Sequence, residues 1–417
     1  MKEKRFASEN LPPETQAKAE RMNLDEAAVG KYVVPAFPFA ETTTPDEFQS
    51  KIRPKLLSEF VRHMYGVIPP PCEELRFEIT SEGTAFGEWA IRRELDIVCC
   101  HHGRERKLHL LLYIPKDRKG KVPVFFGLNF RGNIATTSDP GVTFHPFEPY
   151  PSLGTIRYED NRAGEDKRGF LAQRWEFERV LKRGFATATL GYYDLYPDRP
   201  DGFEASIMRL FYSPEQWNSP ERESGSISAW AWGILRVVDC LTAQEELDAN
   251  KIIVHGHSRL GKTALWAGAN DPRIALTVSN CSGTCGAKLA HRYFGENYEW
   301  INQWNPHWMR ARFAQYSGHD ADCPVDQHFL LAAIAPRLLY IASATEDIYA
   351  DPRGEFLSAR YASKAWRIFN RQGLQTSEFP EPGKLIGDQV AYYLRIGNHS
   401  FLPENWSALL NFATARF

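Results

Sequence analysis

The segment from Lys251 to Trp266 constrains the fold more than any other part of the sequence. A short apolar run ends at Gly256, a serine follows at position 258, and a helical pattern begins at once. An apolar run of this length, without alternating polar residues, is typical of a strand buried on both faces. A buried strand, a tight turn and a helix in direct succession predict a parallel sheet covered by helices.

Similar apolar strands alternate with helices through the rest of the chain. We expect strands at residues 122–128, 186–191, 252–255, 275–279, 338–343 and 391–396. Helical patterns cover residues 170–182, 226–246, 259–270 and 404–416. Strands that alternate with helices form a mostly parallel sheet with helices on both faces, so the predicted fold class is α/β, a three-layer sandwich.

The N-terminal part of the chain has a different pattern. Residues 1 to about 70 are polar, helical and loop-rich, and this part ends at the helix-breaking run Pro69-Pro70-Pro71. Strand candidates joined by short turns follow, as in an antiparallel meander, at residues 75–80, 89–99 and 107–114. We therefore expect an N-terminal extension over residues 1–72 that packs on a single α/β domain over residues 73–417.

The composition excludes several classes of partner. The formal net charge of −2 gives no basic field for nucleic acid or an anionic membrane. No apolar run approaches the length of a transmembrane helix. The N-terminus lacks the apolar region of a signal peptide, which predicts a cytoplasmic location if the sequence is complete. Seven cysteines, an odd number, fit no disulfide-rich scaffold. Separately, we expect the protein to be a monomer.

Ser258 is the candidate nucleophile. It lies between the strand and the helix, in the context of a nucleophile elbow, where a strained backbone holds the hydroxyl clear of the sheet. Gly256 and Gly261 leave room for the strand and the helix to approach each other. The second glycine lies three residues after the serine, not two as in G-x-S-x-G. The alternative is a structural serine, but the whole context favours the nucleophile.

The sequence Gly256-His-Ser-Arg-Leu-Gly-Lys262 resembles the G-x-S-R-x-G-K signature of glucuronoyl esterases, carbohydrate esterase family 15. The chain also resembles bacterial members of that family at Phe126–Phe130, Asn305–Trp308, Pro324–His328, Ile334–Arg337 and Ala350–Phe356. This resemblance implies an α/β-hydrolase catalytic domain that needs no cofactor. The implied substrate is an ester between glucuronic acid on xylan, or its 4-O-methyl form, and a lignin alcohol, and the implied location is secreted or periplasmic.

The same resemblance assigns the base and leaves a choice for the acid. His399 follows the last apolar strand, as the general base of such hydrolases does, whereas the rival His328 precedes an earlier strand. Relatives often place a glutamate where this chain has Cys281. A neutral thiol cannot stabilise an imidazolium as a carboxylate does. We therefore assign the acid to Asp347, after strand 338–343, with Glu346 as the fallback.

Further residues match ligands of the substrate in the family. The backbone N–H of Arg259 is expected in the oxyanion hole, and its guanidinium adds positive charge there. Lys262 and Glu296 match residues that bind sugar hydroxyls. Tyr349 stands where many members have tryptophan. Each of the last two residues is also compatible with a packing role.

One run of residues has the composition of a metal site. Cys99-Cys100-His101-His102 ends a predicted strand, where neighbouring side chains point to opposite faces, so we expect no metal there. Two alternatives to a glucuronoyl esterase stay open. One is a carboxylesterase of another specificity, such as an acetylxylan esterase, and the other is a degenerate carbohydrate-binding protein.

The first prediction tests the nucleophile. Ser258→Ala should lower the rate of ester hydrolysis by several orders of magnitude while the protein stays folded, because the acyl-enzyme can no longer form. Hydrolysis of an aryl acetate measures the rate, and circular dichroism monitors the fold. A variant that keeps more than about a tenth of the activity removes Ser258 from the mechanism.

Overall fold

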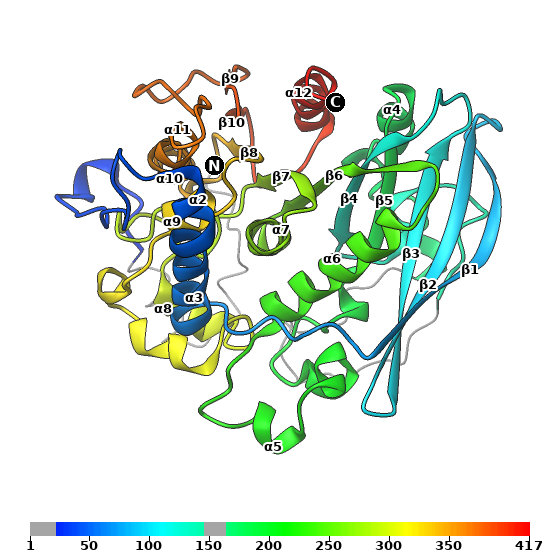
Figure 1. The fold of residues 1–417 in the computed structure, drawn as a ribbon, viewed down its shortest axis with the longest axis horizontal. Coiled ribbons are helices and arrows are strands. Elements are labelled where there is room, and N and C mark those ends of the chain that lie inside the picture. Colours follow the sequence, from blue (N-terminus) through cyan, green and yellow to red (C-terminus); the bar gives the residue numbers. More distant parts are fainter. Residues whose placement is uncertain (1–21, 146–163) are drawn as a thin grey trace.

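A ten-stranded mixed sheet runs through the centre of the protein (Figure 1), with strand order β1-β2-β3-β5-β4-β6-β7-β8-β10-β9. The computed structural model describes residues 22–145 and 164–417. The first strands form an antiparallel meander of β1 (Glu74–Ala85), β2 (Ala90–His101) and β3 (Arg104–Pro115). This meander joins the rest of the sheet because β3 pairs antiparallel with β5 (Ala186–Gly191).

The second part of the sheet is parallel. It consists of β5 together with β4 (Val122–Asn129), β6 (Leu247–His257), β7 (Ile274–Asn280), β8 (Leu338–Ala344) and β10 (Val390–Arg395). A short strand that the sequence analysis missed, β9 (Leu385–Gly387), pairs antiparallel with β10 at the edge. The predicted mostly parallel sheet with antiparallel N-terminal strands is confirmed.

Helices cover both faces of this sheet. Figure 1 shows α4 (Phe177–Lys182) and α12 (Pro403–Thr414) above the sheet and α6 (Ser226–Thr242) and α7 (Arg259–Asn270) below it. Strand β4 shows why both faces are apolar. Phe125 packs in the cluster that contains α12, whereas Val124 and Phe126 pack in the cluster of α6 and α7. The three-layer sandwich therefore follows from strands without polar alternation.

The remaining helices lie in the N-terminal extension or between the strands. They are α2 (Pro45–Glu47), α3 (Arg53–His63), α5 (Pro214–Trp217), α8 (Tyr298–Trp304), α9 (Gln327–Ala332), α10 (Pro352–Ala362) and α11 (Lys364–Arg367). Within the described residues, no helix has both the length and the apolar character to cross a membrane. The predicted helix over 170–182 is broken, because Glu176 adopts a left-handed conformation just before α4.

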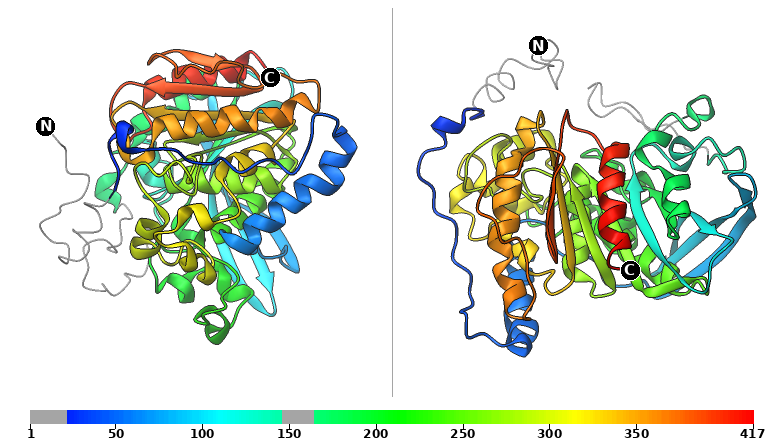
Figure 2. Two further views of the ribbon diagram at one scale, coloured as in Figure 1. Left: turned by 90° about the vertical axis from the view of Figure 1, so that its left-hand side faces the viewer. Right: turned by 90° about the horizontal axis from the view of Figure 1, so that it is seen from above.

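The N-terminal extension packs along the outside of the α/β domain (Figure 2). The Arg53 side chain donates hydrogen bonds to the carbonyl oxygens of Ala333 and Ala269, at 2.9 and 2.5 Å. After α3, the ring of Tyr65 stacks on that of Trp266 in α7, with centroids 4.9 Å apart. Buried contacts of this kind join the extension to the domain. The boundary at residue 72 stays a prediction.

Strand β6 and helix α7 touch at Gly256. A Cβ atom on this residue would lie 2.0 Å from the carbonyl oxygen of Leu260, in the first turn of α7. That atom belongs to the backbone, so no side-chain rotation can relieve the clash. Only glycine lets the helix begin this close to the end of the strand.

The second prediction follows from this contact. Gly256→Ala should lower the free energy of unfolding by about 1–3 kcal/mol or more, because the backbone of α7 must move to admit the methyl group. Urea denaturation measures the loss. Gly191→Ala is the matched control: its φ is −66°, and the atom nearest to the new Cβ, the Cα of Gly132, would lie 3.7 Å away. Equal stability of the two variants would contradict the argument.

Candidate active site

Ser258 has the strained backbone expected of an elbow. Its φ and ψ are 58° and −128°, a conformation that costs about 1–3 kcal/mol for a residue with a side chain. The surrounding structure holds it there, because its N–H donates to the carbonyl of Asn280 at 2.9 Å and its carbonyl accepts from Gly261 at 2.9 Å. Ser258 therefore lies at the carboxyl end of β6, directly before the N-terminus of α7.

His399 and Asp347 form a hydrogen-bonded pair. The Nδ1 of His399 lies 2.5 Å from the Oδ2 of Asp347, whose side chain is only 1% exposed. This contact places the histidine proton on Nδ1, where the carboxylate accepts it, and leaves the basic lone pair on Nε2. The ring of His399 also lies 4.5 Å, between centroids, from the ring of His257, the residue before Ser258. The structure thus places the three residues of the predicted triad at the carboxyl-terminal ends of the parallel strands β6, β8 and β10.

The loop that carries His399 is held from two sides. Arg395, buried at the end of β10, donates hydrogen bonds to the carbonyls of Ile396 and Asn398. The buried amide of Asn280 donates to the carbonyl of Ser400 at 3.0 Å and contacts the Nδ1 of His257 at 2.8 Å. Asn280 therefore links the nucleophile turn to the histidine loop.

The two rival residues lie elsewhere. Glu346 is exposed, and its backbone N–H donates to the carbonyl of Gly397 at 2.9 Å. His328 is buried, and its Nε2 contacts the carbonyl oxygen of Pro35 in the N-terminal extension at 2.9 Å. The contacts of His328 are those of a residue that anchors the extension.

Cys281 lies beside the Asp347–His399 pair. Its sulfur, a carboxylate oxygen of Asp347 and a ring nitrogen of His399 all lie within 4.8 Å of one another. Burial and the neighbouring carboxylates of Asp347 and Glu355 raise the pKa of the Cys281 thiol well above its usual value. The thiol is therefore neutral and lies beside the Asp347 carboxylate.

Glu355 is a buried carboxyl group behind this cluster. Its Oε1 accepts hydrogen bonds from the backbone N–H groups of Ser282 and Gly283, at 2.8 and 2.9 Å, and its Oε2 accepts from the Ser343 hydroxyl at 2.5 Å. Burial raises the pKa of Glu355 to about 7, although these hydrogen bonds oppose the shift. The residue ties the turn after Cys281 to strand β8 and helix α10.

Arg259 begins α7 with a buried acidic partner. Its guanidinium forms an ion pair with Asp198 and lies 5.1 Å from the centre of the Trp308 ring. Asp198 also contacts His307 Nε2 at 2.8 Å and accepts from Trp308 Nε1 at 2.7 Å. Burial opposes ionisation of Asp198, but Arg259 and these donors outweigh it and hold the pKa of Asp198 below its usual value. This partner keeps a cation at a helix N-terminus, where the helix dipole disfavours it.

Lys262 lies one turn further along α7. It is buried, its Nζ donates to the carbonyl of Ser282, and it lies 5.7 Å from the Trp308 ring centre. Burial lowers the pKa of Lys262, while the nearby charge of Glu296 opposes the shift. The Glu296 N–H donates to the carbonyl of Tyr349 at 2.9 Å, so the loops of these two residues are joined. Lys262, Glu296 and Tyr349 thus form one connected group, whose contacts with substrate stay a proposal.

The sequence analysis missed two residues of this centre. Asp198 lies seven residues after β5, and the signal for it was indirect: a cation at the first position of a helix requires a nearby acid. Glu355 stood inside one of the resembling segments, but no pattern marked it as buried. Both are single carboxylates whose partners lie far away in the sequence.

The segment Cys99–His102 differs from the expectation in one respect. Cys99 is buried in the core and Cys100 faces Arg76, as alternation predicts. The two histidines instead lie together, with ring centroids 4.2 Å apart, and both face Glu73. The reason is that His102 adopts a φ of +49° in the turn and so leaves the strand geometry.

The chain is similar to several known proteins. The family description "Glucuronyl esterase, fungi" matches residues 210–370. Carbohydrate esterase MZ0003, from an unknown prokaryotic organism, is 38% identical over 408 residues, which cover 96% of this chain and 93% of that protein. A glucuronoyl esterase structure from Solibacter usitatus is 35% identical, with a TM-score of 0.85 over 94% of this chain and 100% of the other.

A further solved structure is a promiscuous CE15 esterase from a marine bacterial metagenome. It is 38% identical to this chain, with a TM-score of 0.85 over 95% of this chain and 100% of the other. The fold and these likenesses define a carboxylic ester hydrolase with an α/β-hydrolase fold. The chain belongs to carbohydrate esterase family 15, so the predicted resemblance is confirmed.

The third prediction separates Asp347 from Cys281. Asp347→Asn keeps the geometry but removes the charge that stabilises the imidazolium, so kcat should fall by up to about 10⁴-fold. Cys281→Ala should lower kcat by less than about 10-fold, because a neutral thiol adds no charge that stabilises the imidazolium. Steady-state hydrolysis of an aryl acetate measures both.

A double variant serves as the control. Cys281→Glu restores a carboxylate beside His399, so it should return part of the activity lost in Asp347→Asn. If Cys281→Ala is crippled while Asp347→Asn is nearly normal, the assignment of the acid is wrong.

Proposed function

We propose that the protein cleaves esters of glucuronic acid through a covalent acyl-enzyme formed on Ser258. The observation that carries the proposal is the 2.5 Å contact between His399 Nδ1 and Asp347, beside a serine held at a φ of 58°. In the first step His399 Nε2 takes the Ser258 proton while Oγ attacks the ester carbonyl. The histidine then returns the proton to the alcohol, which leaves. Water then enters, His399 takes one of its protons, and the resulting hydroxide attacks the acyl carbonyl. The histidine returns the proton to Ser258 Oγ as the uronic acid is released.

The oxyanion would form at the N-terminus of α7. There the backbone N–H of Arg259 lies in the first turn, where it has no acceptor within the helix. The Arg259 guanidinium adds a positive charge that Asp198 holds in place. These donors are fixed before the reaction starts, so stabilising the developing negative charge requires little reorganisation.

The sugar ring is assigned to Lys262, Glu296 and Tyr349. A cation, a carboxylate and an aromatic ring can together bind hydroxyl groups and one face of a pyranose. The name "4-O-methyl-glucuronoyl methylesterase" of a Podospora anserina relative supports this substrate class. That relative is 40% identical over 129 residues, 28% of this chain and 27% of its own length. Xylan-linked glucuronate, or its 4-O-methyl form, esterified to lignin alcohols is the proposed natural substrate.

A second candidate is a carboxylesterase of other specificity, such as an acetylxylan esterase. It is favoured by the departures at Cys281 and Tyr349 and by the relative described as promiscuous. A degenerate binding protein fits less well, because the Asp347–His399 pair and the strained Ser258 are both present. We propose a monomer without nucleic-acid or membrane partners, located outside the cytoplasm as the family resemblance implies.

The fourth prediction compares substrates. The kcat/KM for a benzyl glucuronate ester should exceed that for an acetylated xylo-oligosaccharide by about 10²-fold or more, because buried polar groups that bind the uronic ring reject a substrate without it. Initial rates on both substrates give the two values of kcat/KM. An aryl acetate, which has no sugar, is the control for an active enzyme. Faster cleavage of the acetylated sugar would favour the second candidate, and no turnover of any ester would favour the binding protein.

A further inference from the structure

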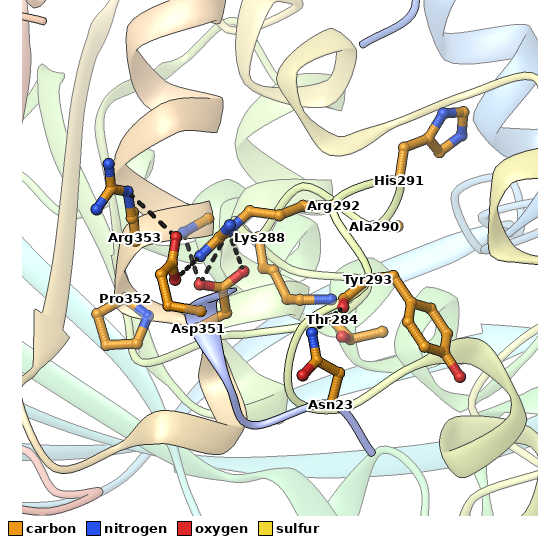
Figure 3. A network of polar contacts seen from close by, with 12 residues as sticks. Asn23, Thr284, Lys288, Ala290, His291, Arg292, Tyr293, Asp351, Pro352 and Arg353 are labelled. Atoms are coloured by element: carbon orange, nitrogen blue, oxygen red, sulfur yellow. Dashed lines mark hydrogen bonds and ion pairs between the residues drawn. The ribbon is translucent and has the colours of Figure 1, made fainter. Parts of the chain in front are cut away.

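A network of charged residues joins the start of the described chain to the loops beside the candidate site (Figure 3). Residues Met22–Ala28, called here the N-terminal strap, run past the loop that contains Arg292 and Gly295. Gly295 N–H donates to the carbonyl of Asn23 at 2.8 Å, and the Asn23 side-chain amide donates to the carbonyl of Tyr293 at 3.2 Å. The strap therefore holds this loop through its backbone.

Arg292 is the centre of the network. Its side chain is 2% exposed and contacts two carboxylates, Glu26 of the strap and Asp351, the latter from Nε to Oδ2 at 3.1 Å. Figure 3 shows Arg292 and Asp351 close to Arg353, which lies in the first turn of α10 and pairs with Glu26 at 3.6 Å. A buried guanidinium requires compensating negative charge. Glu26 thus neutralises two cations, one from the loop of Arg292 and one from the first turn of α10.

The two loops tied by this network are those assigned to the sugar. Gly295 precedes Glu296, and Tyr349 lies two residues before Asp351. The loops meet directly, because the Glu296 N–H donates to the carbonyl of Tyr349, and Gly295 packs so closely that a Cβ would lie 2.4 Å from that oxygen. A shift of Arg292 or Asp351 therefore changes where Glu296 and Tyr349 lie.

The catalytic acid is held separately. Thr345 N–H donates to the carbonyl of Arg395, and Glu346 N–H donates to that of Gly397, both at 2.9 Å. These bonds fix the residues before Asp347 to the end of β10. Glu26 of the strap pairs with Arg353 after this loop, and it reaches Asp351 through Arg292, which contacts both carboxylates.

We propose that Glu26 of the N-terminal strap is a positioning residue for glucuronate binding, which sets the places of Glu296 and Tyr349 through Arg292 and Asp351 without acting on the triad. The inference rests on the proposed function, since those two residues are assigned there to the sugar. It gives the N-terminal extension a role in specificity in addition to its packing contacts.

The experiment compares Glu26→Gln with two matched variants. In Glu26→Gln, KM for the benzyl glucuronate ester should rise about 10-fold while kcat stays within about 2-fold, because binding geometry is lost and the triad is not. The kcat/KM for an aryl acetate, which has no sugar, should stay within about 2-fold. Glu26→Asp keeps the charge and should recover part of the loss. Glu41→Gln, an exposed residue of the same extension beside a different cavity, should behave as wild type.

Several outcomes would overturn the inference. An unchanged KM in Glu26→Gln contradicts it, and so does an equal loss on both substrates, which indicates a merely structural role. A wild-type protein that cleaves the aryl acetate but not the glucuronate ester contradicts the proposed function instead. In that case hydrogen exchange at the amides of Gly295 and Glu296 decides: Glu26→Gln should accelerate it, and unchanged exchange rejects the positioning role.

Discussion

Strand β6 and helix α7 approach each other so closely at Gly256 that the backbone conformation of the turn between them is tightly constrained. Ser258 takes the strained conformation in that turn, and the helix N-terminus begins beside its side chain. The positions of Arg259 and Lys262 follow, because both are in the first turns of the same helix. The sheet on either side fixes the strand, so the strain at one residue is held by the packing of the whole domain.

Around this turn two buried acids are each held against a basic side chain. Arg259 faces Asp198, and His399 faces Asp347. Removing one member of such a pair leaves the other without compensation in a medium of low polarity, which is usually more harmful than losing both. This arrangement keeps each group in one orientation before substrate arrives, the condition under which charges stabilise a transition state best.

The sequence predicted the sheet well because its strands are apolar on both faces and alternate with helices. It also located Ser258, His399 and Asp347, since each follows directly on a predicted strand, although their catalytic roles stay proposals. Residues whose importance depends on distant partners were beyond its reach. Asp198 is 61 residues from Arg259, and nothing local distinguishes it from other acids. Glu26 and Arg292 are 266 residues apart, so only the folded chain shows their contact.

The thiol of Cys281 has a chemical consequence of its own. Alkylating agents, peroxides and disulfides react with the thiolate form of cysteine, and here burial between two carboxylates disfavours that form. The group is also almost closed to solvent, with 2% of its surface exposed. A cysteine in the centre of a hydrolase would ordinarily make it vulnerable to oxidants and to thiol-blocking reagents. In this protein burial and the surrounding acids keep the sulfur in the less reactive thiol form.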